Sequence, residues 1–219
     1  MEEILINGKP YAYEPYPWNY KPEFFDRQIA SEFLSILKDA FDSANIRFYL
    51  NFGTLLGAIR DHDFIPHDVD MDLAMMEKDV PAFLYLLPDL EKKGVKLCRN
   101  WRTTFYSVVY KGIICDFDVL YRPAFPYCIW FYGILEGQYI PKKYIGDMKL
   151  YNFLGNDYYV PADAEKYLVL SYGKTWRIPQ KGKGANPMPK WMVLEKFYNK
   201  VKRKLRYLKC KYITHTEFK

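Results

Sequence analysis

The sequence lacks the features that mark exported, membrane-spanning and zinc-ribbon proteins. Its first ten residues contain two glutamates instead of a basic stretch followed by an apolar one, and no segment approaches about 18 consecutive apolar residues. The four cysteines are far apart and form no C-x-x-C pair, which excludes the usual zinc spacing and a dense disulfide framework. We therefore expect no signal peptide, membrane anchor or transmembrane segment, reduced cysteines, and a cytoplasmic location.

The composition also lacks the signature of a disordered chain. Half of the 219 residues are hydrophobic and 19% are aromatic, so the chain can bury a core of ordinary size. The net charge of +6 is concentrated in residues 190–219, which contain ten Lys or Arg against two Glu. Apolar residues three and four apart predict a helix there. We divide the chain into an extended, Pro/Tyr-rich arm (1–22), a globular domain (23–189), and a basic C-terminal helix and tail (190–219).

Hydrophobic periodicity predicts a mixture of helices and strands in the globular domain. Apolar residues at steps of three and four indicate helices, and short runs rich in β-branched and aromatic residues indicate strands. The predicted helices are residues 23–44, 55–60, 77–93 and 163–172. The predicted strands are residues 46–52, 71–76, 104–111 and 113–121, the last two forming a hairpin around Gly112. Residues 123–159 contain too many loop signals for their elements to be ordered.

An alternating acidic segment carries the clearest chemical signal. Asp70 and Asp72 lie two residues apart on a predicted strand, so they share one face while Met71 and Leu73 point into the core. Two adjacent carboxylates repel each other when ionised, and a bound Mg²⁺ or Mn²⁺ relieves the repulsion and prefers such hard oxygen ligands. Asp68 extends the row if the strand starts that early. The pattern predicts a divalent-cation site, with a solvated acidic strand edge as the alternative.

Two further segments fit a site for phosphoryl transfer. Gly53 and Thr54 precede a predicted short helix, where glycine lets the backbone approach a phosphate and the helix directs free N–H groups at it. Asp116 and Asp118 share a face of another predicted strand, and a neighbouring strand could bring one of them to the metal. The residues alone leave the choice between these two aspartates open. Three carboxylates and a Gly-Thr helix start are typical of phosphoryl transfer.

Four blocks of sequence, in this order and spacing, resemble the LicD/fukutin family. The blocks are FGTLLGAIR (52–60), FIPHDVDMDL (64–73), FDVLY (117–121) and YGKTWRIP (172–179), the last being closest to fukutin. The resemblance implies an α+β nucleotidyltransferase fold, with a mixed β-sheet flanked by helices. It also implies a phosphotransferase that moves a phospho-alcohol, of ribitol phosphate or phosphocholine type, from a CDP-linked donor to a glycan hydroxyl and releases CMP.

The resemblance also implies roles for individual residues. Asp70 and Asp72 match the paired metal-binding aspartates, Asp118 matches the third catalytic carboxylate, and Asp68 is an accessory metal ligand. The expected nucleotide or phosphate contacts are Gly53, Thr54, Arg60 and Lys174. The residues alone leave two alternatives for Arg60 and Lys174, which are either phosphate ligands or members of surface ion pairs.

Two other functions stay open at the level of the sequence. The same fold could add a nucleotide to an acceptor and release pyrophosphate, or the chain could be a non-catalytic module whose basic tail binds an anionic surface. We expect a CDP-linked donor and a glycan acceptor as partners, a contact of the tail with an anionic surface, and no specific nucleic acid. Trp176 is expected to pack in the core or to stack on a cytosine base.

Overall fold

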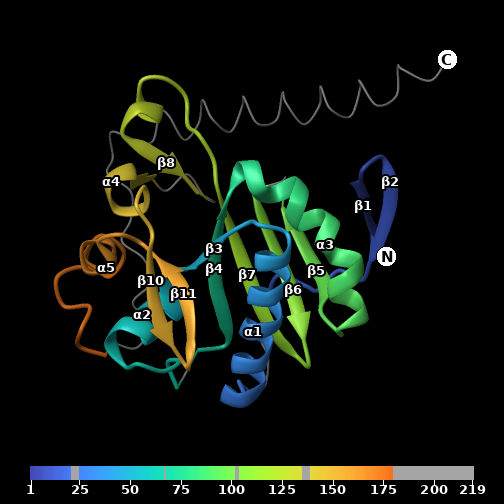
Figure 1. Cartoon of the computed structure of the whole chain (residues 1–219), viewed down its shortest axis with the longest axis horizontal. Helices are drawn as coiled ribbons and strands as arrows, with labels where there is room; N and C mark the ends of the chain where they lie inside the picture. Colours follow the sequence, from blue (N-terminus) through green and yellow to red (C-terminus); the bar gives the residue numbers. More distant parts are fainter. Residues whose placement is uncertain (21–24, 67, 102–103, 135–138, 180–219) are drawn as a thin grey trace.

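A seven-stranded mixed β-sheet forms the centre of the protein (Figure 1), with strand order β10-β11-β3-β4-β7-β6-β5. This computed structural model describes residues 1–20, 25–66, 68–101, 104–134 and 139–179. The predicted C-terminal helix and tail (190–219) lie outside the described residues. The strands of the sheet are β3 (Phe48–Leu50), β4 (Asp70–Met76), β5 (Lys96–Trp101), β6 (Phe105–Tyr110), β7 (Ile113–Leu120), β10 (Lys149–Phe153) and β11 (Asn156–Val160).

Helices cover the sheet, and Figure 1 shows α1 and α3 lying side by side across it. The helices are α1 (Arg27–Ser43), α2 (Phe52–Arg60), α3 (Val80–Lys92), α4 (Lys142–Ile145) and α5 (Ala164–Tyr172), with 3-10 turns η1 (Glu77–Asp79) and η2 (Tyr127–Ile129). Two small hairpins complete the described residues: β1 (Glu2–Ile6) with β2 (Lys9–Tyr13), and β8 (Phe131–Gly133) with β9 (Tyr139–Pro141). No helix within the described ranges is long and apolar enough to span a bilayer.

An aromatic cluster joins the sheet to α1 and α3. Phe117 of β7 is fully buried, and its ring stacks on Phe41 of α1 with the centroids 5.4 Å apart. The same ring lies 5.1 Å from that of Phe83 in α3 and 6.3 Å from that of Phe48 in β3. Because Phe117 alternates with the aspartates on either side of it along β7, the strand buries an aromatic face and leaves an acidic face on the other side of the sheet.

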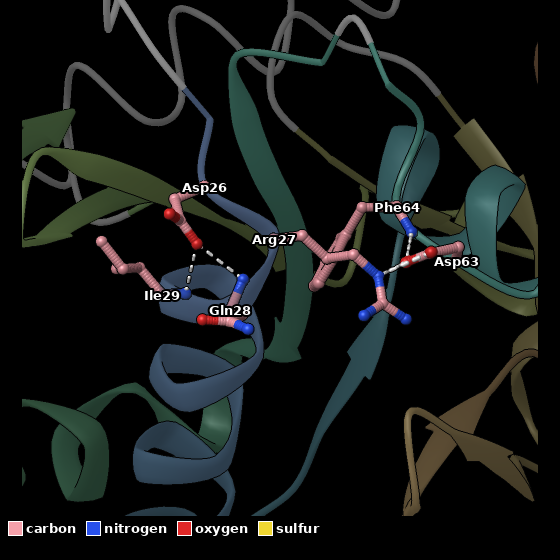
Figure 2. Close-up of polar contacts among 6 residues, drawn as sticks. All are labelled: Asp26, Arg27, Gln28, Ile29, Asp63 and Phe64. Atoms are coloured by element: carbon pink, nitrogen blue, oxygen red, sulfur yellow. Dashed lines mark hydrogen bonds and ion pairs between the residues drawn. The ribbon is translucent and has the colours of Figure 1, made fainter.

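Polar contacts fix the start of α1 (Figure 2). The Asp26 carboxylate accepts hydrogen bonds from the backbone N–H groups of Gln28 and Ile29, at 2.7 and 3.0 Å, and so caps the helix. In the first turn, Arg27 Nε lies 2.6 Å from both carboxylate oxygens of Asp63, in the loop after α2. The cap and the ion pair therefore fix the position of α1 beside the loop that leads into β4.

The structure differs from the sequence predictions in several places. The arm predicted to be extended contains the β1–β2 hairpin, because Asn7 and Gly8 both adopt positive φ (51° and 72°), as a tight two-residue hairpin turn requires. The helix predicted at 55–60 starts earlier, at Phe52. Strand β5 was not predicted from its sequence. The predicted hairpin of residues 104–111 and 113–121 and the predicted helix 163–172 are confirmed as β6–β7 and α5.

Replacing Phe117 with alanine should destabilise the protein by about 3–5 kcal/mol, because the change removes a fully buried ring and leaves a cavity between α1, α3 and the sheet. Urea unfolding followed by circular dichroism measures this loss. Phe125→Ala serves as the control, since that side chain is 79% exposed. Equal losses for the two variants would contradict the packing described here.

Candidate active site

One face of the sheet gathers aspartates from β4 and β7. Asp70 and Asp72 lie on the opposite face of β4 from Met71 and Leu73, which are fully buried in the core. The parallel pairing of β4 with β7 sets Asp72 directly beside Asp116. Neighbouring strands are about 4.8 Å apart, so three carboxylates from two strands share a small area of one face.

The first turn of α2 lies against these carboxylates. The backbone N–H of Gly53 donates a 2.8 Å hydrogen bond to Asp72 Oδ2, and Thr54 Oγ1 accepts one of 2.8 Å from the Asp72 backbone N–H. A Cβ atom on Gly53 would lie 2.6 Å from Asp68 Oδ2 and 3.0 Å from Asp72 Oδ2, so only glycine fits. The sequence predicted Gly53 and Thr54 in a turn before the helix, whereas they lie inside its first turn, and their positive helix end faces the acids.

Asp118 belongs to a buried hydrogen-bond network. Its Oδ2 accepts a 3.0 Å hydrogen bond from the Asn51 side-chain amide, and Asn51 Oδ1 accepts one of 2.5 Å from the Tyr167 hydroxyl. Asn51 immediately precedes α2 and Tyr167 lies in α5, so the network connects three elements that surround the acidic face. Asp118 is 6% exposed and pairs with Ala74 rather than with an aspartate of β4.

Asp116 differs from Asp118 in its surroundings. One of its carboxylate oxygens, Oδ1, is buried and accepts no hydrogen bond of good geometry among the described residues, although the nearby Ser107 hydroxyl lowers the pKa of the carboxyl. Ser107 of β6 lies beside Asp116 in the sheet, and Arg99 of β5 lies beside Ser107. The side chains of Arg99 and Ser107 are buried. The sequence analysis did not identify Arg99, because β5 itself was not predicted and a single arginine among apolar residues gives no motif.

The other residues predicted to contact the nucleotide or phosphate lie in different surroundings. Arg60, at the end of α2, forms a two-point ion pair with the adjacent Asp61, with N–O distances of 2.6 and 2.8 Å. Lys174 is exposed, and no contact of its side chain links it to the acids. Trp176 is buried in the core at 3% exposure, so it packs and does not offer a stacking surface. Tyr172, at the end of α5, was not predicted as a site residue, and burial together with the nearby carboxylates raises the pKa of its hydroxyl.

Burial and mutual repulsion raise the pKa values of several aspartates on the acidic face. Burial first, and then the charges of its acidic neighbours, raises the pKa of Asp72 well above its usual range, while the Gly53 N–H opposes this shift. Burial also raises the pKa of Asp116 to about 6 and, together with the charge of Asp70, that of Asp68 to about 6. Arg99 opposes the rise at both Asp70 and Asp116. A cation on this face would relieve the repulsion.

The residues on this face fit a Mg²⁺ or Mn²⁺ ion in their chemistry. Within the described ranges, no three His, Cys, Asp or Glu side chains come together as a complete set of metal ligands. Mg²⁺ does not require such a cage, since it is usually bound by one or two carboxylates together with substrate phosphates and water. Asp70 and Asp72 offer hard oxygen ligands, and Asp116 offers a buried oxygen that accepts no hydrogen bond of good geometry among the described residues.

The chain matches a known family over the segment that holds these residues. The model described as "LicD/FKTN/FKRP, nucleotidyltransferase domain" matches residues 45–163, which is more than half of the chain and includes every predicted aspartate. Together with the mixed sheet flanked by helices, this match confirms the predicted α+β nucleotidyltransferase fold. Helix α5 and the N-terminal hairpin lie outside the matched residues.

Several curated proteins are similar to the chain. Human "Ribitol-5-phosphate transferase FKTN" is 26% identical over 71% of this chain and 34% of its own length. Uncharacterized proteins of Rickettsia typhi and Caenorhabditis elegans are 38% and 46% identical over 26% and 23% of this chain, and over 18% and 13% of their own lengths. The matches thus span about a third or less of these relatives.

Two solved structures of ANT(2'')-Ia are also similar. The complex with adenylyl-2''-tobramycin matches 63% of this chain and 70% of its own at 15% identity and a TM-score of 0.45. The solution structure matches 87% and 99% at 12% identity and a TM-score of 0.49.

The metal-free protein should lose stability as the pH rises from 4 to 7. Because the pKa of Asp116 is raised to about 6, the folded state holds a proton that the unfolded state has already released, so this stabilisation is present at low pH and lost as the pH passes 6. The loss from Asp116 alone is about 2 kcal/mol. Urea unfolding in EDTA at both pH values measures it. Asp116→Asn should reduce the drop by that amount, and an unchanged drop would show that Asp116 is ionised normally.

Proposed function

The chain belongs to the LicD/FKTN/FKRP family of nucleotidyltransferase domains, and from this premise we propose that it is a metal-dependent phosphotransferase. Its donor is a CDP-linked alcohol of the ribitol phosphate or phosphocholine type, its acceptor is a glycan hydroxyl, and CMP is the leaving group. The single observation that carries the proposal is the placement of aspartates from β4 and β7 on one face of the sheet, against the first turn of α2.

The first turn of α2 and the aspartates have complementary tasks in this reaction. Asp70 and Asp72 hold Mg²⁺ or Mn²⁺, which when bound neutralises the donor diphosphate. Gly53 and Thr54, in the first turn of α2, would lie beside the donor phosphates. The absence of a side chain at Gly53 lets the carboxylates of Asp68 and Asp72 pack against this turn. The acceptor hydroxyl attacks the phosphorus nearer the alcohol, a new P–O bond forms, the bond to CMP breaks, and the hydroxyl proton passes to a carboxylate base or to water.

The register of the sheet bears on the choice of the third carboxylate. The sequence analysis favours Asp118 as the third catalytic and metal-binding carboxylate and leaves Asp116 as the alternative. Asp116 pairs with Asp72 and has a buried oxygen that accepts no hydrogen bond of good geometry among the described residues, whereas Asp118 pairs with Ala74 and accepts a hydrogen bond from Asn51. We therefore propose Asp116 for the role at the metal. Asp118 then fixes Asn51 and, through it, the start of α2.

Activity should appear as CMP release that requires both a CDP-alcohol and a divalent cation. The assay incubates the purified protein with CDP-ribitol or CDP-choline, a panel of glycans and Mn²⁺, and measures CMP; EDTA provides the control. Pyrophosphate released from labelled CTP or ATP would indicate nucleotide transfer instead. Neither product with any substrate of the panel would favour a non-catalytic binding module.

Neutral substitutions should separate the carboxylates by role. Asp70→Asn and Asp72→Asn keep the side-chain shape but remove the charge, so each should lower turnover at least about 100-fold while the metal-free protein stays as stable or becomes more stable. Asp116→Asn should act in the same way. Asp118→Asn should keep most of the activity, because an asparagine oxygen can still accept the Asn51 hydrogen bond.

Turnover, together with circular dichroism to verify folding, measures these effects. A folded Asp118→Asn protein without activity, beside a nearly normal Asp116→Asn protein, would return the third carboxylate to Asp118, as the sequence favours. Full activity of Asp72→Asn would reject the proposed chemistry.

A further inference from the structure

We propose that Arg99 is a built-in counter-charge for the acidic face, and that the segment of residues 16–20 holds its guanidinium in position. Arg99 acts as a positioning residue, since its positive charge lies on the same face of the sheet as Asp116, two strands away. The inference rests on the proposed function only in taking this face as the active site. Nothing in the family match assigns a role to Arg99, and residues 16–20 lie outside the matched segment.

A β-bulge brings Arg99 to the acidic face. In the pairing of β5 with β6, Leu97 pairs with Val108, but Arg99 pairs with Ser107, so the register shifts at Cys98. Without the shift, Arg99 would pair with Tyr106 and point to the side of the sheet that packs on the helices. The extra residue turns Arg99 onto the other side, as bulges commonly do beside functional sites.

The bulge places Arg99 in a row of polar residues that crosses four strands. Arg99 lies beside Ser107, Ser107 beside Asp116, and Asp116 beside Asp72. These residues come from β5, β6, β7 and β4 in the order of the sheet. Because serine is short, it leaves space for the long arginine side chain to extend along the row toward the aspartates.

The segment of residues 16–20 fixes the guanidinium from the other side. Arg99 Nη2 donates hydrogen bonds to the carbonyl oxygens of Pro17 and Tyr20, at 2.8 and 3.4 Å. The guanidinium also lies 5.4 Å from the ring centroid of Trp18, within the range of a cation–π contact. The backbone N–H of Tyr16 donates a 2.8 Å hydrogen bond to the Cys98 carbonyl oxygen, which attaches the segment to the bulge itself. The segment of residues 16–20 therefore binds the arginine that the bulge turns onto this face of the sheet.

The charge of Arg99 is buried on the same face of the sheet as Asp116. Its side chain is 7% exposed, and its Nε–H is buried without a hydrogen-bond partner, so water does not screen the charge and the carbonyl oxygens of the arm do not neutralise it. A buried charge needs a partner of opposite sign, and Asp116, the next residue after Ser107 in this row, is placed to supply it.

A metal-free double-mutant cycle tests the charge pairing. Arg99→Met should lower the melting temperature by roughly 6–12 °C in EDTA, because it leaves a buried carboxylate without its counter-charge. Adding Asp116→Asn to Arg99→Met should restore at least about half of that loss. Asp118→Asn, two residues along the same strand face, is the matched control and should restore none. If Arg99→Met does not fold, the double variant with Asp116→Asn should fold and the one with Asp118→Asn should not.

Binding of Mn²⁺ alone, measured by electron paramagnetic resonance, provides a readout that loss of packing would not reproduce. Arg99→Met removes a positive charge near the cation, so Mn²⁺ should bind at least about threefold more tightly than to Arg99→Lys, which keeps the charge. General damage to the structure would weaken binding in both variants. Trp18→Ala should reduce the coupling between Arg99 and Asp116, since it loosens the arm without removing the charge.

The outcomes distinguish this inference from the proposed function. Additive effects of Arg99→Met and Asp116→Asn would overturn the counter-charge, whatever the activity of the protein. Coupling that persists unchanged in Trp18→Ala would remove the arm from the inference. Strong coupling in a wild-type protein that neither binds Mn²⁺ nor releases CMP would retain the counter-charge and reject the proposed function.

Discussion

The parallel pairing of β4 with β7 is the constraint on which both the core and the candidate site depend. One face of the pair presents Met71, Leu73 and Phe117 to the helices, and the other face presents the aspartates. Side chains alternate strictly along a strand, so a shift of one residue would turn the acids into the core and the aromatic ring outward. The cost of burying a carboxylate in place of Phe117 therefore selects the register that also assembles the acidic face.

The acidic face is unfavourable by itself, and the surrounding elements reduce the cost without removing it. The Gly53 N–H and the positive end of α2 stabilise the negative charge of Asp72, and the Asn51 amide does so for Asp118. Even so, burial and mutual repulsion keep the pKa of Asp72 well above its ordinary value. Unrelieved repulsion of this kind is typical of a site that awaits a cation and a substrate, because functional sites retain arrangements that stability alone would remove.

A feature could be predicted from the sequence when its signal lies within a few neighbouring residues, and could not when it depends on the pairing of distant strands. The placement of Asp70 and Asp72 on one face needed only the two-residue period of a strand, and α5 needed only its own periodicity. The choice between Asp116 and Asp118 depends on how β7 pairs with a strand some 40 residues earlier, which no local pattern contains. The position of Arg99 depends on a bulge in an unpredicted strand. The hairpin turn at Asn7-Gly8 did have a local signal, the Asn-Gly pair, and it was overlooked.

The charged residues of the acidic face lie within the segment that matches the family, whereas some of the residues that hold them in place lie outside it. The matched segment, residues 45–163, contains every aspartate of the acidic face and Arg99. The contacts that fix the ends of these networks come from outside it: Tyr167 of α5 binds Asn51, and the carbonyl oxygens of Pro17 and Tyr20 bind Arg99. The support from α5 is part of the core, since Tyr167 is fully buried, whereas the arm contacts the edge strand β5. Local opening of the arm would therefore release Arg99 while the core stays folded, because residues 17–20 are exposed and such segments open with less free energy than global unfolding requires.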